Sequence, residues 1–248
     1  MRKKTVIISD QFEDADNLAG IVKDLGYPVA FTDCPWPRDH AAEHGRKIAR
    51  KSSYIYAGDE GHYVFDVMGG PVAFVSTLLY RRYPNRKNIV ATISNHFGVN
   101  LLPVTPTKPA QSHVDSNVMI ANPWIICNDL GYHNKSNSTV FDSVQSFGYN
   151  DRVILKIRKE LDYLPLNCLV LEDNGLPFVI ANSMTSDFLD ELRNLRINHT
   201  TVTSDISPKQ GGSIRCRTNE VSNPTRLFQD KSRYNGIFEY KIYSENQS

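Results

Sequence analysis

The sequence has almost no excess of positive over negative charge, few cysteines and no long apolar run. The formal net charge is +1 at pH 7, which leaves no broadly basic surface and argues against a nucleic-acid-binding protein. No apolar run approaches the roughly 18 residues that a membrane-spanning helix requires. The first apolar run, residues 6–8, is too short for a secretory signal. We therefore expect a cytoplasmic protein that binds neither nucleic acid nor membranes.

The cysteines are few and widely spaced. The four of them form no Cys-X-X-Cys pair, which argues against a zinc knuckle or a dithiol redox motif. The glycine-rich patterns that hold nucleotide phosphates, GxGxxG and GxxxxGKS or GxxxxGKT, are missing as well. Each thiol must therefore be explained by packing or by chemistry. No pattern in the sequence demands a metal or a cofactor.

The sequence does contain an alternation of strand and helix patterns over its whole length. Helices are predicted at 13–25, 72–82, 138–147 and 186–195. Strands are predicted at 5–9, 29–31, 53–56, 63–65, 89–93, 117–120, 124–127, 152–157, 167–171, 178–181, 199–203 and 238–243, with a hairpin turn at Asn174-Gly175. The order strand, strand, helix, strand recurs, and no linker interrupts it. We therefore predict one α/β domain over residues 1–248, in which a circular arrangement of such units would gather their loops at one mouth.

Cys216 has the most unusual setting of the four cysteines. It follows Gly211 and Gly212 and lies between Arg215 and Arg217, whose positive charge favours the reactive thiolate. Two other cysteines fall inside apolar strand segments, where inert core thiols are expected. The sequence therefore makes Cys216 a candidate nucleophile, with a thiol in an ordinary loop as the alternative.

A second candidate group is the pair His113 and Asp115. In an extended segment, residues two apart point to the same side, so both side chains would face one site while Val114 enters the core. A carboxylate beside an imidazole orients it for proton transfer. A structural polar pair is the alternative for so short a pattern.

The segment around Trp36 and Asp39 offers two groups that suit a planar cation. The Trp36 ring gives it a flat face, and the two oxygens of Asp39 match a guanidinium fork. The alternative is a helix start, with Asp39 as the N-cap and Trp36 in the core. An acidic turn that contains Glu60 precedes the next strand, and an ordinary turn is its favoured interpretation.

Together these segments resemble the guanidino-group modifying enzymes, or penteins, and most closely the agmatine deiminases. The family's Trp-X-Arg-Asp motif stands here as Trp36-Pro37-Arg38-Asp39, and its His-Ile/Val-Asp motif as His113-Val114-Asp115. Its Glu-Gly-Gly turn is matched imperfectly by Glu60-Gly61-His62. Its glycine-rich loop that ends in the nucleophilic cysteine corresponds to residues 211–216. The order of the motifs agrees over residues 33–219.

The resemblance implies a fold and a set of roles. The fold would be a five-bladed, pseudo-symmetric α/β propeller of ββαβ units. Cys216 would be the nucleophile and His113 the general acid and base. Asp39 and Asp115 would bind the guanidinium nitrogens of a small guanidino substrate, and Trp36 would line the pocket.

Three further residues are weaker candidates for the same site. Arg215 and Arg217 could bind a substrate carboxylate or favour the thiolate. The family carries a further carboxylate between its Glu-Gly turn and its His-X-Asp motif, whereas residues 64–112 contain only Asp66 as an acid. Either Asp59 or Glu60 replaces it, or the substrate is held differently, or the activity is altered. This departure leaves the substrate unassigned.

The sequence therefore predicts a hydrolase of a guanidino or amidino compound, of arginine- or agmatine-like chemistry, that needs neither metal nor cofactor. An amidinotransferase using the same covalent intermediate is one alternative. A non-catalytic binding protein on the same fold and an unrelated cysteine hydrolase are the others. A homo-oligomer is compatible with the sequence.

Overall fold

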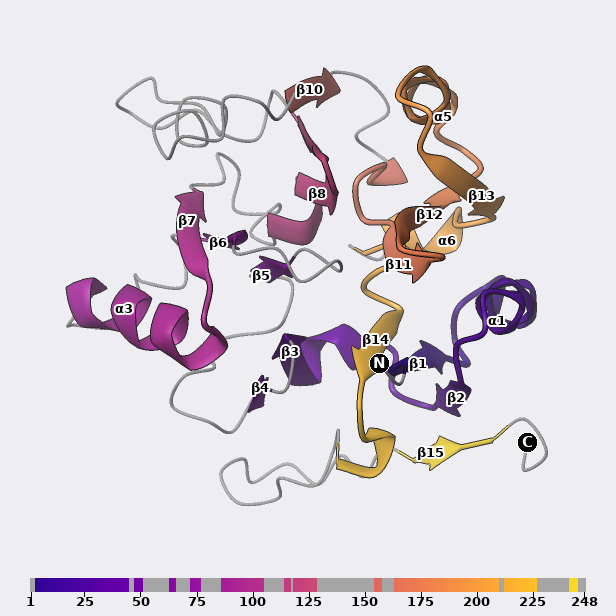
Figure 1. Cartoon of the computed structure of the whole chain (residues 1–248). Helices are drawn as coiled ribbons and strands as arrows, with labels where there is room; N and C mark the ends of the chain where they lie inside the picture. The colour runs from indigo at the N-terminus through magenta and orange to yellow at the C-terminus, as the bar shows by residue number, and fades with distance from the viewer. Residues whose placement is uncertain are drawn as a thin grey trace.

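The structure of the chain is a computed structural model. It describes residues 3–44, 47–50, 63–65, 72–76, 86–104, 114–116, 118–128, 154–157, 163–209, 212–226 and 241–244. Within these residues the strands form five small sheets (Figure 1). One sheet is the hairpin of β3 (Ala41–His44) and β4 (Lys47–Arg50), and the other four mix parallel and antiparallel pairs.

Three of the mixed sheets repeat the predicted order, a hairpin followed by a parallel strand. The first of these sheets consists of β5 (Tyr63–Phe65), β6 (Val72–Ser76) and β7 (Asn100–Val104). The second consists of β8 (Val118–Ala121), β9 (Trp124–Asn128) and β10 (Ile154–Ile157). The third consists of β11 (Leu169–Asp173), β12 (Leu176–Asn182) and β13 (Asn198–Val202). Helices α3 (Arg86–Phe97) and α5 (Ser186–Asn194) join the parallel strands in the first and third sheets. This recurrence confirms the predicted α/β architecture. The predicted strand at 53–56 and helix at 138–147 lie outside the described residues.

The hairpin between β11 and β12 forms at the predicted turn. Asn174 and Gly175 have φ values of 50° and 80°, the left-handed conformation that a two-residue hairpin turn requires. Helix α5 then begins after Thr185 and buries Phe188 and Leu192, which are four residues apart and so lie on one helical face.

The fourth mixed sheet joins distant parts of the chain. Its order is β14 (Thr218–Val221), β1 (Thr5–Ser9), β2 (Val29–Thr32) and β15 (Ile242–Tyr243). Helix α1 (Ala15–Asp24) connects the parallel pair β1 and β2. β14 runs antiparallel to β1, with Ile7 opposite Asn219. The segment that follows Cys216 is therefore fixed beside the first strand of the chain.

Two predicted elements are wrong. Residues 72–82 were expected to form a helix, but 72–76 are strand β6, in which Ala73, Phe74 and Val75 are fully buried. Residues 89–93 were expected to form a strand, but they lie inside helix α3. A short apolar run that is buried on both faces has no helical or strand period of its own, so its pattern does not separate the two states.

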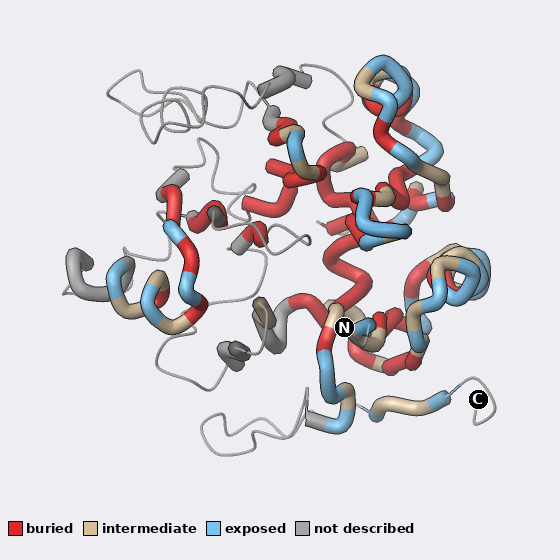
Figure 2. Tube along the Cα trace, in the orientation of Figure 1, coloured by how far each residue is buried: buried red, intermediate tan, exposed pale blue. Residues whose placement is uncertain are grey.

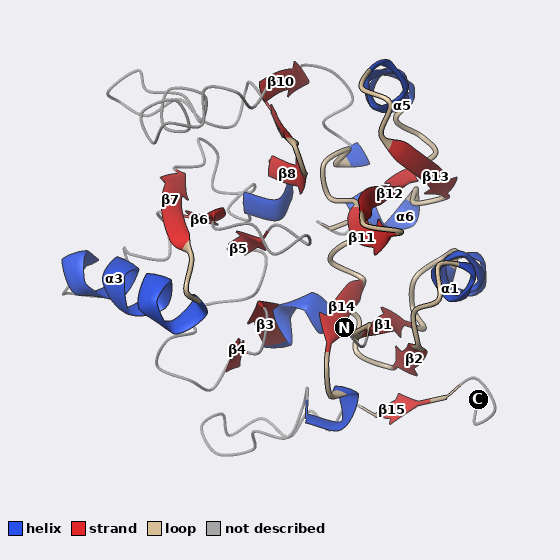
Figure 3. Ribbon diagram, in the orientation of Figure 1, coloured by secondary structure: helices blue, strands red, loops and turns tan. Residues whose placement is uncertain are grey.

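Helices α1, α3 and α5 lie on the outside of the strands (Figure 3). Strands β1, β2, β8 and β12 and the turn before β14 are largely buried, whereas the outer faces of α1 and α5 are exposed (Figure 2). One core cluster packs beneath α1 and a second beneath α5. None of the helices in the described ranges is both long and apolar enough to cross a membrane. Closure into five blades stays a prediction.

Candidate active site

Cys216 lies in a buried turn that leads directly into β14. The turn covers residues 214–217, and Cys216 is only 3% exposed. Backbone hydrogen bonds within residues 213–218 close the turn. Asn167 holds it from a different part of the chain, because its Oδ1 accepts hydrogen bonds from the backbone N–H of Ser213 at 2.9 Å and of Cys216 at 3.2 Å. The candidate nucleophile is therefore on a fixed backbone.

The structure brings Trp36 against this turn, with Gly212 between the ring and the cysteine. A Cβ atom placed on Gly212 would lie 2.5 Å from Cζ3 of Trp36 and 2.8 Å from Cβ of Cys216. Side chains do not tolerate contacts this short, so glycine is required for the ring and the cysteine to approach each other. Two of the residues that the sequence assigned to one site thus lie on either side of one glycine.

Arg217 ties three segments together at the same place. Its guanidinium carbon lies 3.9 Å from the centre of the Trp36 ring, a cation–π contact. Its Nε donates a hydrogen bond to Ser207 Oγ (3.0 Å) in the short helix α6 (Ile206–Lys209), and Nη1 donates to the carbonyl of Pro35 (2.8 Å). The guanidinium is therefore engaged by protein groups on several sides.

The charge of Arg217 also acts on the thiols nearby. Burial lowers the pKa of Arg217 below its usual value. Interactions with Glu13, Cys216 and Cys34 oppose this shift but do not cancel it. The guanidinium is therefore close enough to Cys216 to interact with charge on its sulfur.

Asp115 is fully buried in a single 3-10 turn, η4 (Val114–Ser116). Its Oδ2 lies 3.9 Å from Nε of Arg38, and Nη1 of Arg38 lies 4.0 Å from Oε1 of Glu220 in β14. Arg38 is itself 2% exposed, so one buried cation lies between two carboxylates. Val114 is in the core as predicted, but the extended conformation assumed for this segment is wrong.

Arg215 and Asp115 both act on a second buried thiol, that of Cys168. Burial raises the pKa of Cys168 to about 12; the charge of Arg215 opposes this rise and that of Asp115 adds to it. The Cys168 sulfur lies 3.0 Å from the sulfur of Met119. Cys168 is thus an inert core thiol, as predicted, and it shows that Asp115 and Arg215 approach the same region.

Three of the predicted site residues are not placed. His113 and Glu60 lie outside the described residues, and so does the side chain of Asp39, whose backbone belongs to the 3-10 turn η1 (Pro37–His40). This turn packs beside β14 (Figure 1). Residues 41–44 continue from this turn as strand β3, so the alternative of a helix start with Asp39 as its N-cap is wrong. The role of Asp39 as a substrate ligand stays a prediction.

Comparison with known proteins separates sequence from fold. No protein-family model matches the sequence, and no curated protein matches it significantly. The fold matches that of ArgZ, an arginine dihydrolase from cyanobacteria, with a TM-score of 0.67 and 11% identity over 91% of this chain and 40% of that chain. The N-terminal domain of ArgZ, bound to product, gives the same TM-score and identity over 89% of this chain and 98% of the domain.

An agmatine deiminase from C. jejuni is similar as well, with a TM-score of 0.54 and 12% identity over 90% of this chain and 94% of that chain. The chain has the pentein fold. It spans about two fifths of full-length ArgZ but almost all of that protein's N-terminal domain. The α/β fold expected from the resemblance is thereby confirmed, whereas its closure into five blades stays a prediction and the activity is a separate question.

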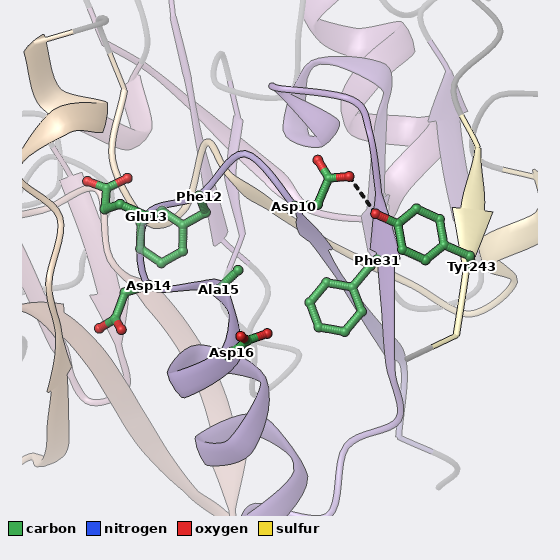
Figure 4. Close-up of a pocket in the computed structure, with 8 residues that line it drawn as sticks. All are labelled: Asp10, Phe12, Glu13, Asp14, Ala15, Asp16, Phe31 and Tyr243. Carbon is green, nitrogen blue, oxygen red and sulfur yellow. Dashed lines mark hydrogen bonds between the residues drawn. The ribbon is translucent and has the colours of Figure 1, made fainter. Parts of the chain in front are cut away.

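A cavity of about 330 Å³ lies elsewhere in the chain, at the start of α1 (Figure 4). It is strongly acidic, and a hydrogen bond joins Asp10 to Tyr243 at its wall. Neither Cys216 nor Trp36 lines it, so it is distinct from the candidate active site. Among the described residues no three potential ligands are placed to hold a metal. The lining residues are Asp10, Phe12, Glu13, Asp14, Ala15, Asp16, Phe31 and Tyr243.

Sequence reasoning missed the residues that support the site. Asn167 was assigned only to a strand, and Ser207 to no element. Arg38 was quoted within a motif but given no role. Each acts through a contact with a residue far away in the chain, so no local spacing reveals it. Only Arg38 could have been found from the sequence, because it stands inside the Trp36-Pro37-Arg38-Asp39 motif.

Gly212→Ala tests the close approach of the ring and the cysteine. We expect it to lower activity by about tenfold or more, because the new Cβ displaces Cys216 or Trp36, and to cost about 1–3 kcal/mol of stability through overpacking. Activity and urea unfolding measure the two effects. Gly20→Ala in α1 is the control, since its Cβ would meet nothing within 4 Å. Equal behaviour of the two variants would contradict the packing described.

Glu13→Gln tests how α6 is held beneath Arg217. The Glu13 carboxylate accepts hydrogen bonds from Ser207 Oγ (2.6 Å), Ser207 N (3.1 Å) and Ile206 N (2.9 Å). Burial raises the pKa of Glu13, but these hydrogen bonds outweigh it, so the pKa lies below its usual 4.5. The ionised group therefore stabilises the fold above that value, and this contribution is lost as the pH falls through the lowered pKa.

We expect Glu13→Gln to cost about 1 kcal/mol at pH 7, and the difference from the unchanged chain to shrink as the pH falls below 4. Thermal unfolding measured from pH 7 to pH 3 provides the comparison. The same substitution at the exposed Glu172 serves as the control. A difference that stays constant over this range would show that the charge of Glu13 is not involved.

Proposed function

We propose that this chain is a cysteine-dependent hydrolase of a guanidino or amidino compound, with Cys216 as its nucleophile. One observation carries the proposal: Cys216 lies on a fixed, buried turn against Trp36, in a fold shared with an arginine dihydrolase and an agmatine deiminase. A surface thiol in an ordinary loop would be neither buried nor held in this way.

The chemistry proceeds through two displacements at the guanidinium carbon. The Cys216 thiolate attacks this carbon to form a tetrahedral adduct, and His113 protonates the departing nitrogen as the C–N bond breaks. The product of this step is a covalent S-alkylthiouronium. Water gives a proton to His113 and attacks the same carbon, and cleavage of the C–S bond releases a ureido product and the thiolate. No metal or redox partner is needed to balance these steps.

The carboxylates hold the planar cation in line with the sulfur. We assign Asp39 and Asp115 to this role, because two carboxylates fix both the plane and the position of a guanidinium. Asp115 Oδ2 lies 3.9 Å from Arg38 Nε, a distance of an ion pair rather than of a hydrogen bond. We therefore assign Asp115 two roles: it balances the charge of the buried Arg38, and it binds the substrate.

Trp36 and the two arginines take different parts in this scheme. Trp36 lines the pocket, and Arg217 rather than the substrate stacks on its ring. Because Arg217 also donates to Ser207 and Pro35, we assign it to stabilising negative charge on the Cys216 sulfur rather than to binding a substrate carboxylate. Arg215 and Glu60 remain candidates for the substrate's tail and for the missing carboxylate.

The proposed substrate is a small arginine- or agmatine-like molecule. AgrE, whose fold is also similar, was solved with L-arginine and with ornithine and NAD+. We further propose that residues 1–248 form a single five-bladed domain in the cytoplasm, with these groups at its centre and with self-association allowed. The proposed chemistry depends neither on the cytoplasmic location nor on self-association.

Incubation with a panel of arginine, agmatine, methylated arginines and guanidino acids tests the proposal. Ammonia, amine and ureido product are measured, and the protein mass is followed for a covalent adduct. A ureido product without an added amine supports the hydrolase. Product formed only with an acceptor amine would identify an amidinotransferase. No product, together with no labelling of Cys216 by a chloroacetamidine, would indicate a binding protein.

A further inference from the structure

Asn167 lies in the loop that enters β11, and its backbone is fixed before it reaches the Cys216 turn. Its N–H donates to the carbonyl of Leu164 at 2.9 Å, and Leu164 has a left-handed φ of 49°. Asn167 is 1% exposed, although asparagine is usually a surface residue. A buried amide in a fixed loop calls for a reason in its contacts.

Those contacts all go to one place. The side-chain Oδ1 accepts from Ser213 N and Cys216 N, and the backbone carbonyl of Asn167 accepts from Arg215 N at 3.1 Å. Three backbone amides of the turn thus end on a single residue. Because backbone N–H groups only donate, the two side-chain contacts also fix which end of the amide is the oxygen.

The other end of the amide has no partner in the described part of the chain. Nδ2 of Asn167 is buried and makes no hydrogen bond there. A buried donor without an acceptor is unfavourable, so the fold alone would be served better by a group that only accepts. Among the described residues, only the oxygen end of the amide makes hydrogen bonds.

We infer that Asn167 is the positioning residue of Cys216: it fixes the backbone of the nucleophile turn so that the sulfur faces the guanidinium carbon. The inference rests on the proposed function. The residue acts through the Cys216 amide, so its removal should affect the rate of attack more than the binding of substrate. A displacement of the turn by about 1 Å is sufficient to slow an oriented reaction by up to a hundredfold.

The chain contains a matched control for this role. Asn182 is also 1% exposed, and its Oδ1 also accepts from two backbone amides, those of Met184 (3.1 Å) and Ser204 (3.3 Å). Its Nδ2 donates to Ser204 O at 2.7 Å. Asn182 is therefore an amide of equal burial whose donor is used, and it holds the loop at Ser204. That loop meets Ser213 through a hydrogen bond between the two hydroxyl groups at 3.2 Å, whereas Asn167 contacts the backbone of Cys216 itself.

The experiment compares Asn167→Ala, Asn167→Asp and Asn182→Ala in the whole chain. Three quantities are measured for each: kcat and KM with the panel substrate that is turned over, the pH dependence of Cys216 alkylation by iodoacetamide with the site assigned by peptide mapping, and thermal unfolding. Alkylation needs no substrate, so it reports on Cys216 even if the panel contains none.

We expect Asn167→Ala to lower kcat by about ten- to a hundredfold with little change in KM, and to alter the rate of Cys216 alkylation. Asn167→Asp keeps both acceptor contacts and should recover part of kcat, while its charge raises the alkylation midpoint by about one pH unit. Asn182→Ala should lose comparable thermal stability but keep kcat and the alkylation profile close to those of the unchanged chain.

Two results would overturn the inference. One is an equal loss of kcat in Asn167→Ala and Asn182→Ala at equal folded fraction. The other is an alkylation profile that neither change at position 167 alters. If Asn167→Ala does not fold, Asn167→Asp alone decides, because an unmoved midpoint places the side chain out of reach of the sulfur. An unchanged chain that is alkylated normally but turns over no substrate would contradict the proposed function instead, and the alkylation profiles would still test Asn167.

Discussion

Replacing Cys216 with alanine is expected to abolish turnover of guanidino substrates, by roughly a thousandfold or more. In the proposed mechanism the covalent intermediate forms on its sulfur, and the buried thiol of Cys168 is not a substitute for it. Burial raises the pKa of Cys168 to about 12, which disfavours its thiolate at neutral pH. Initial rates of ureido-product formation, and the loss of the covalent adduct by mass spectrometry, measure the effect.

Cys168→Ala is the matched control for this change. Both residues are buried cysteines near Arg215: Cys216 follows it in the sequence, and Cys168 interacts with its charge. Only Cys216 lies on the turn against Trp36. We expect Cys168→Ala to retain activity once any loss of folded protein is taken into account. Activity that survives in Cys216→Ala, or that disappears equally in both variants, would exclude Cys216 as the nucleophile.

The largest effect on stability is expected for Arg38→Met, at about 3–5 kcal/mol. Methionine keeps most of the length and the apolar stem of the side chain but removes the charge. Asp115 and Glu220 would then lose the buried cation that lies about 4 Å from each of them. The cost is mainly that of removing a buried cation from beside the fully buried Asp115 and the partly buried Glu220. Urea unfolding at pH 7 measures the difference.

Two comparisons make this prediction specific. Arg193→Met removes an arginine that pairs with Asp190 on the surface, where both side chains are more than half exposed, and should change stability by no more than about 1 kcal/mol. Adding Asp115→Asn to Arg38→Met should restore part of the lost stability, because it removes one of the two negative charges that lie about 4 Å from the Arg38 side chain. A loss for Arg38→Met no greater than that for Arg193→Met would mean that the buried cation does not balance these carboxylates.

Local patterns in the sequence predicted the part of the fold whose signals lie close together. In residues 163–209 the Asn174-Gly175 turn, the helix start after Thr185 and the spacing of Phe188 and Leu192 all indicate the same structure, and the structure agrees. In residues 72–97 the apolar runs are short and lack such boundaries. Strand and helix were therefore exchanged there.

The candidate site could be predicted as a set of segments but not as a set of contacts. Motif order indicated that Trp36, Asp115 and Cys216 belong together, and the structure places Trp36 against the Cys216 turn. The contact of Asn167 with Cys216 joins residues 49 positions apart. Such pairings depend on how whole sheets pack, which no short spacing encodes. The stacking of Arg217 on Trp36 is also a contact between distant residues that no short spacing reveals. The sequence had instead predicted that the Trp36 ring would face the substrate.

The pairing of β1 with β14 has a consequence for how the protein is made. On one side β1 pairs with β2, which follows it closely, but its other side waits for residues 218–221. While the chain is being synthesised, Val6, Ile7 and Ile8 therefore belong to an open apolar edge of the kind that attracts other chains. Cys216, the proposed nucleophile, lies just before the strand that covers this edge. The pairing that closes the apolar edge of β1 therefore also fixes the position of Cys216, so a chain that exposes this edge lacks the proposed site.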